Sequence, residues 1–81
     1  MVERVDLEQH RHADRQRWCN GDLWDPAAVV VTVGLLGDGR WFVQRHQLGG
    51  AEKALAYGTE WLARGTARRW MRTIGGTWAE A

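Results

Sequence analysis

Apolar residues concentrate in the middle of the chain, in two short runs separated by a glycine-containing turn. Residues 29–36 form the first run, Gly37-Asp38-Gly39 follows, and Trp41-Phe42-Val43 begins the second run. β-Branched and aromatic residues on both sides of such a turn are typical of an antiparallel hairpin. The sequence therefore predicts a β-hairpin over residues 28–36 and 40–47.

The length of the turn determines which side chains of the hairpin share a face. A two-residue loop pairs Leu36 with Trp41 and scatters apolar side chains over both faces. A three-residue loop with Gly39 in the left-handed conformation pairs Leu36 with Arg40 instead and gathers the apolar side chains on one face. These are Val29, Val31, Val33, Leu35, Trp41 and Val43. We therefore predict the bulged, three-residue loop.

Two helices are predicted after the hairpin. Residues 51–64 carry small and apolar residues at helical spacing, and Gly65 is suited to end that helix. Thr66 can cap a second, short helix over residues 67–74, although an edge strand there is the alternative. The helical interpretation is preferred because the cap, the apolar spacing and the glycines that follow agree.

Residues 1–20 contain few apolar residues, and their charges alternate in sign. One interpretation is a helix over residues 6–18, capped by Asp6 and ended by Asn20-Gly21. The other is a short strand within residues 2–7, followed by a tight turn at Asn20-Gly21. We favour the helix because the segment lacks the alternation of β-branched and aromatic residues that a strand shows.

Together these elements predict a single small α+β domain over residues 1–81, with loose termini at 1–5 and 77–81. Trp78 is expected to dock onto the domain or onto a partner. The second face of the hairpin carries Val30, Leu36 and Phe42, which the N-terminal segment or a second copy of the chain has to cover. On this argument we expect a homodimer.

The composition says more about the cellular compartment of the protein than about its function. The 81 residues have a formal net charge of +1, so no overall field favours nucleic acid. A single cysteine, Cys19, excludes an internal disulfide framework and fits a reducing compartment. No apolar run is long enough to span a membrane and no leader pattern is present. We therefore expect a cytoplasmic protein that is not attached to a membrane.

Three possible chemical motifs fail on their spacing. Residues 33–39 are glycine-rich, but a strand follows them where a phosphate-binding loop needs a helix. The histidines and Cys19 lack the spacing of metal ligands, and no feature brings Cys19 close to His46 as a nucleophile and base. We expect no metal, no cofactor and no enzymatic activity.

The best functional candidate is a basic segment near the C-terminus, formed by Arg64, Arg68, Arg69 and Arg72 with no acidic residue between them. Guanidinium groups gathered on one helix face suit phosphate oxygens, and neighbouring indoles can stack on bases. This predicts a small DNA-binding accessory or regulatory protein. The alternative is a protein-interaction module or inhibitor that uses exposed aromatic side chains. The candidates for that role are Phe42, Trp24 and Trp78.

Overall fold

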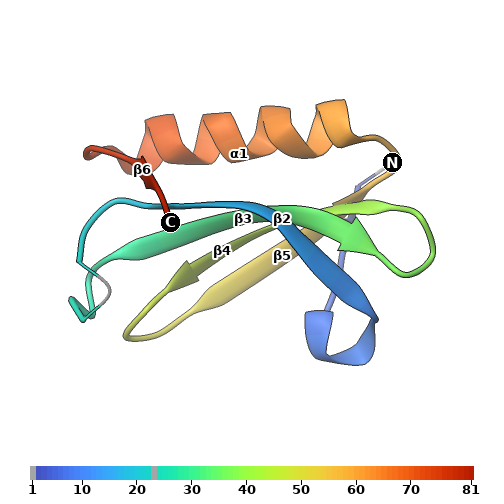
Figure 1. The fold of residues 1–81 in the computed structure, drawn as a ribbon, viewed down its shortest axis with the longest axis horizontal. Helices are drawn as coiled ribbons and strands as arrows, with labels where there is room; N and C mark the ends of the chain where they lie inside the picture. Colours follow the sequence, from blue (N-terminus) through green and yellow to red (C-terminus); the bar gives the residue numbers. More distant parts are fainter. Residues whose placement is uncertain (1, 23) are drawn as a thin grey trace.

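The computed structural model describes residues 2–22 and 24–81 and shows an α+β domain with a six-stranded antiparallel sheet and one helix on one of its faces (Figure 1). The elements are β1 (Glu3–Arg4), the 3-10 turn η1 (Leu7–Gln9), β2 (His12–Cys19), β3 (Val29–Leu36), β4 (Trp41–Gln47), β5 (Glu52–Tyr57), α1 (Glu60–Ile74) and β6 (Ala79–Glu80). The strand order is β1-β5-β4-β3-β2-β6. Strands β2 to β5 thus follow one another as a meander, and the two terminal strands take the two edges.

The central hairpin of β3 and β4 has the register of the three-residue loop. The Leu36 N–H donates to the Arg40 carbonyl at 2.8 Å, and the Gly39 N–H donates to the Leu36 carbonyl at 3.0 Å. Gly39 has a φ of 90°, the left-handed conformation that glycine adopts without a steric penalty. Val33 consequently lies opposite Val43, and both face the helix.

The helix predicted over residues 51–64 is wrong, because most of its first half is strand β5 paired with β4. Ala54 and Ala56 are buried on one face of the sheet, whereas Leu55 and Tyr57 pack on the other. The same residues fit both a helical stripe and a strict alternation. Pairing with β4 decided between them, since tertiary context routinely overrides helix propensity.

A single helix, α1, replaces the two predicted helices. It begins after Thr59, whose hydroxyl accepts a hydrogen bond from the Leu62 N–H at 3.3 Å. It ends at Gly75, which has a φ of 83° and whose N–H donates to the Met71 carbonyl. Both ends therefore have recognisable capping interactions.

The predicted boundary at Gly65 and Thr66 lies inside α1 and does not interrupt it. Residues 67–74 are helical, but as the second half of α1 rather than as a separate helix. The Thr66 side chain is buried and donates to the Tyr57 hydroxyl at 2.6 Å instead of capping a helix. Gly65 lowers helix propensity by about 1 kcal/mol, too little to break a helix that buries an apolar face.

The N-terminal helix predicted over residues 6–18 is also wrong. Asp6 does act as a cap, accepting a hydrogen bond from the Glu8 N–H at 3.0 Å, but only for the 3-10 turn η1. Most of the remaining segment forms β2, which hydrogen-bonds to β3. A bulge at Arg15 shifts the register between Asp14 and Gln16, which explains why the strand shows no regular alternation.

The two termini, expected to be loose, contribute short strands at opposite edges of the sheet. Glu3 lies opposite Ala56 in β5, and Ala79 lies opposite Cys19 in β2. Glu3 falls within residues 2–7, where the alternative interpretation of the sequence placed a short strand. Trp78 docks onto the domain, because its indole N–H donates to the Met71 carbonyl at 3.0 Å.

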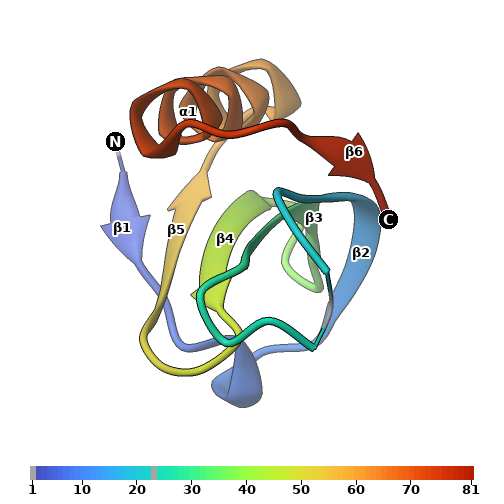
Figure 2. The same cartoon turned by 90° about the vertical axis from the view of Figure 1, so that its left-hand side faces the viewer.

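The sheet carries apolar clusters on both faces. The helix-side cluster consists of Val31, Val33, Val43, Ala63 and Ala67, with partly buried aromatic residues around it. The opposite cluster consists of Val5, Leu7, Leu36, Phe42, Ala54 and Ala56. Figure 2 shows α1 on one side of the sheet and the 3-10 turn on the other.

The same chain covers the second face of the hairpin: the N-terminal segment packs around Leu36 and Phe42, and Ala28 packs with Val30. Phe42 is completely buried there, and Val5 and Leu7 pack in its cluster. Gly34 in β3 leaves room for the ring, since an added Cβ would lie 2.5 Å from a ring carbon of Phe42. The uncovered face on which the expected homodimer rested is thus already covered within one chain.

Candidate nucleic-acid interface

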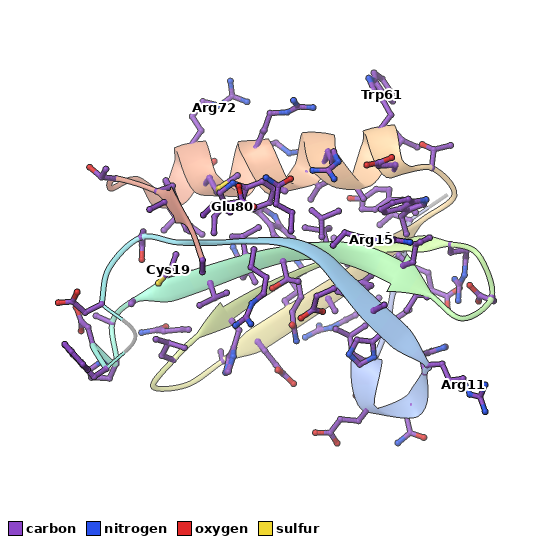
Figure 3. The ribbon with its side chains drawn as sticks, viewed as in Figure 1. Arg11, Arg15, Cys19, Trp61, Arg72 and Glu80 are labelled. Carbon is purple, nitrogen blue, oxygen red and sulfur yellow. The ribbon has the colours of Figure 1, made fainter. Side chains whose placement is uncertain are left out.

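The outer face of α1 is the side that points away from the sheet. Ala63 and Ala67 are buried against the sheet. Because a helix turns once every 3.6 residues, residues about two positions before or after these alanines lie on the opposite side, away from the sheet. We define the outer face by Trp61, Leu62, Gly65, Arg68, Arg69 and Arg72. Figure 3 shows Trp61 and Arg72 projecting away from the sheet, near the two ends of the helix.

A shallow groove of about 380 Å³ runs along this face, and all six residues of the outer face line the groove. Trp61 is 74% exposed and Leu62 is 40% exposed, so two large apolar side chains border the groove in contact with solvent. Gly65 is exposed and has no side chain with which to fill the groove. The groove is therefore open, partly apolar, and bordered by positive charge.

The side of the groove nearest the sheet is held by hydrogen bonds. The Thr66 hydroxyl donates to the Tyr57 hydroxyl at 2.6 Å, and the Arg69 Nη2 donates to the Thr66 hydroxyl at 3.4 Å. Tyr57 and Thr66 also line the groove. These contacts connect one guanidinium to β5 and leave its other donors available.

The charge on this face is uncompensated. Within residues 2–22 and 24–81, no carboxylate lies within 4 Å of Arg68, Arg69 or Arg72. Three arginines of the predicted basic segment are therefore brought together.

Arg64, the fourth predicted arginine, belongs elsewhere. Its Nε forms an ion pair with Glu60 at 2.7 Å, and its Nη1 donates to Gln16 Oε1 at 2.6 Å. It therefore links α1 to β2 on another side of the helix. The structure separates it from the groove.

The three aromatic candidates for partner binding do not form one surface. Phe42 is buried, so its prediction as an exposed contact is wrong. Trp78 is half-buried on α1. Trp24 is 87% exposed, but it lies in the β2–β3 loop, which Figure 1 shows at the left-hand end of the sheet, away from the helix.

Sequence reasoning missed Trp61, the exposed aromatic residue that lies beside the arginines. With a helix drawn over residues 51–64, Trp61 and Arg68 fell in different elements. Once the helix begins at Glu60, the seven-residue separation of Trp61 and Arg68 places them on one face. The signal that could have found it was Thr59 as an N-cap.

A second charged cluster lies at the tip of the hairpin. Arg40 forms ion pairs with Asp38 at 2.9 Å and with Glu3 at 3.5 Å. The hydrogen bonds from the side chain and backbone of Arg40 hold the pKa of the Asp38 carboxyl below its usual value. Here the arginine is compensated, and the cluster connects the turn to β1.

Other chemistry has little support in the part of the chain that the structure describes. There, no three His, Cys, Asp or Glu side chains lie close enough to hold a metal ion. Cys19 is buried and donates to the Gly21 carbonyl, and Val30 of β3 lies between it and His46 of β4. Among the described residues, no helix is both long and apolar enough to cross a membrane.

Comparison of the chain with protein-family models, with curated proteins and with solved structures found no match.

Proposed function

We propose that this protein binds nucleic acid through the outer face of α1, as a non-enzymatic DNA-binding accessory or regulatory protein. The observation that carries the proposal is the grouping of Arg68, Arg69 and Arg72 around one open groove, with no carboxylate among their described neighbours. An exposed Trp61 at the same groove adds a surface for stacking.

Phosphate is the chemical group that this arrangement fits best. A planar guanidinium donates two hydrogen bonds to neighbouring phosphate oxygens, and three of them lie within two turns of one helix. The net charge of +1 means that attraction must come from a local patch rather than from the whole molecule. A patch of three arginines supplies such a local field.

The proposal makes a quantitative prediction about salt. Three phosphate contacts give a slope of about −2 to −3 in a plot of log K against log salt concentration, because bound counterions are released. Fluorescence anisotropy with a labelled DNA oligonucleotide, from about 50 to 200 mM salt, measures this slope. We expect affinity to fall steadily over that range.

The decisive variant is R68A/R69A/R72A, which removes the three charges and leaves every residue of the helix-side and opposite clusters unchanged. Its matched control is R11A/R15A/R17A, which removes three exposed arginines from β2 and the residue before it. We expect the first variant to lose at least tenfold in affinity and the control to lose much less. Equal binding by the wild type and R68A/R69A/R72A would refute the proposal.

A second candidate function is self-association or protein binding through Trp24. This indole is the most exposed large apolar side chain among the described residues. Sedimentation equilibrium at high salt tests it, since an apolar contact survives salt. A dimer that Trp24→Ala converts to a monomer would support it, and a wild-type monomer at high concentration would contradict it.

A further inference from the structure

Gly65 lies in the middle of α1, where neither packing nor backbone geometry requires a glycine. A Cβ added there would meet no atom within 4 Å, and the residue is not among the glycines with positive φ. Glycine in a helix interior is destabilising relative to alanine. The fold would therefore be more stable with a side chain at this position.

The missing side chain opens the groove at one place. Cβ atoms of a helix tilt toward its N-terminus, so a methyl group on residue 65 would lean toward Trp61, one turn earlier. Arg68 and Arg69 lie one turn later and also line the groove. The glycine thus leaves bare backbone between an exposed indole on one side and two guanidinium groups on the other.

This geometry suits a flat group that carries negative charge beside it. An indole offers a face for stacking, and a guanidinium can stack on a ring or bind a phosphate. Arg68 and Arg72 are about 6 Å apart along the helix axis, and Trp61 is about 10 Å from Arg68. A planar ring over Gly65 would therefore have its phosphate, and that of the next nucleotide, within reach of the arginines.

We infer that the groove receives an unpaired base of single-stranded nucleic acid, stacked on Trp61 over Gly65, with Arg68, Arg69 and Arg72 on the adjoining phosphates. The inference rests on the proposed function and specifies its substrate class. In a duplex both faces of each base are already stacked, so an indole standing at the rim of a groove has no base face to contact. A double-stranded ligand would use the arginines alone.

The test compares Gly65→Ala, Trp61→Ala and R68A/R69A/R72A with the wild type. The probes are a labelled dT oligonucleotide and a duplex of equal length, read by anisotropy and tryptophan fluorescence. Stacking of one base predicts that Trp61→Ala weakens single-strand binding by about 5- to 150-fold. The wild type should prefer the single strand and show fluorescence quenching that the variant lacks.

Gly65→Ala gives the sharpest result, because it should act in opposite directions on folding and binding. We expect Tm to rise by about 4–8 °C, while single-strand affinity falls at least fivefold with an unchanged salt slope. Unchanged single-strand affinity in both Gly65→Ala and Trp61→Ala would overturn the inference.

The same variants distinguish failure of base stacking from failure of nucleic-acid binding. If R68A/R69A/R72A abolishes binding but the Gly65 and Trp61 variants bind normally, the groove binds phosphates and no base, and the proposed function survives. If the wild type binds the duplex more tightly than the single strand, the conclusion is again that the groove binds phosphates and no base. If R68A/R69A/R72A also binds normally, both the inference and the proposed function are refuted.

Discussion

The two sides of α1 follow different rules. On the inner side, Ala63 and Ala67 are buried and lie where the helix meets the sheet, so their small size is set by packing. On the outer side, Gly65 is smaller still, yet a Cβ added there would have no packing neighbour within 4 Å. The inner side is explained by folding alone, whereas the outer side keeps an exposed indole and three uncompensated charges that folding does not require.

The largest expected effect compares two tryptophans of the same helix. Trp70 packs against the helix-side cluster, and the Arg45 guanidinium lies 5.2 Å from its ring centroid. Trp70→Ala should lower the free energy of unfolding by about 3 kcal/mol. Trp61→Ala should change it by less than about 0.5 kcal/mol, because the ring is mostly exposed. Urea denaturation measures both, and equal losses would remove the distinction between the two sides.

A second comparison enlarges one residue on each side. Ala67→Leu inserts extra methylene groups where the side chain is 1% exposed, and should cost about 1–3 kcal/mol. Arg68→Leu, the neighbouring residue on the outer face, should stay within about 0.5 kcal/mol of the wild type. A well-tolerated Ala67→Leu would show that α1 is less closely packed on the sheet than the structure indicates.

Replacing each of two glycines of this helix region by alanine should change the free energy of unfolding in opposite directions. Gly65→Ala should raise the free energy of unfolding by about 1 kcal/mol, because the position is helical and unobstructed. Gly75→Ala should lower it by about 1–3 kcal/mol, since its φ of 83° and ψ of −175° disfavour any side chain. Thermal unfolding distinguishes them, and destabilisation by Gly65→Ala would mean that the glycine serves the fold.

The smallest expected effect on stability comes from the ion pair of Asp38 and Arg40. Unlike the arginines of the outer face, Arg40 has carboxylate partners. Because Arg40 lowers the pKa of Asp38 in the folded state, folding favours the carboxylate. The resulting stability is present above the usual pKa of about 3.8 and is lost as the pH falls through the lowered value. Asp38→Asn should therefore be slightly less stable than the wild type at neutral pH. The difference should vanish in acid, and a difference independent of pH would contradict this assignment.

The sequence was most informative where a local rule had one solution. The apolar residues of β3 and β4 share a face only if Gly39 forms a bulged turn, and this register is present. It was least informative where two periods overlapped, as over Ala54 and Leu55, or where a bulge at Arg15 interrupted the alternation of β2. In both segments, pairing with a neighbouring strand decided the outcome, and that pairing is not encoded locally.

The candidate site was predicted only in part for the same reason. Arg68, Arg69 and Arg72 were recognised from charge alone, because no acidic residue interrupts them. Trp61 was missed because the helix boundary was misplaced. The burial of Phe42 could not be predicted, because it depends on the packing of Val5 and Leu7 against a strand distant in the sequence.

The most direct test of the account is to locate the bound nucleic acid on the protein. A 15N-labelled sample titrated with a short dT oligonucleotide reports shifts of backbone amides and of each indole N–H. We predict that the shifts concentrate on the outer face of α1, including the indole of Trp61 and the amide of Gly65. Shifts confined to the Trp24 loop or to β2, or no shifts at low salt, would contradict the central claim.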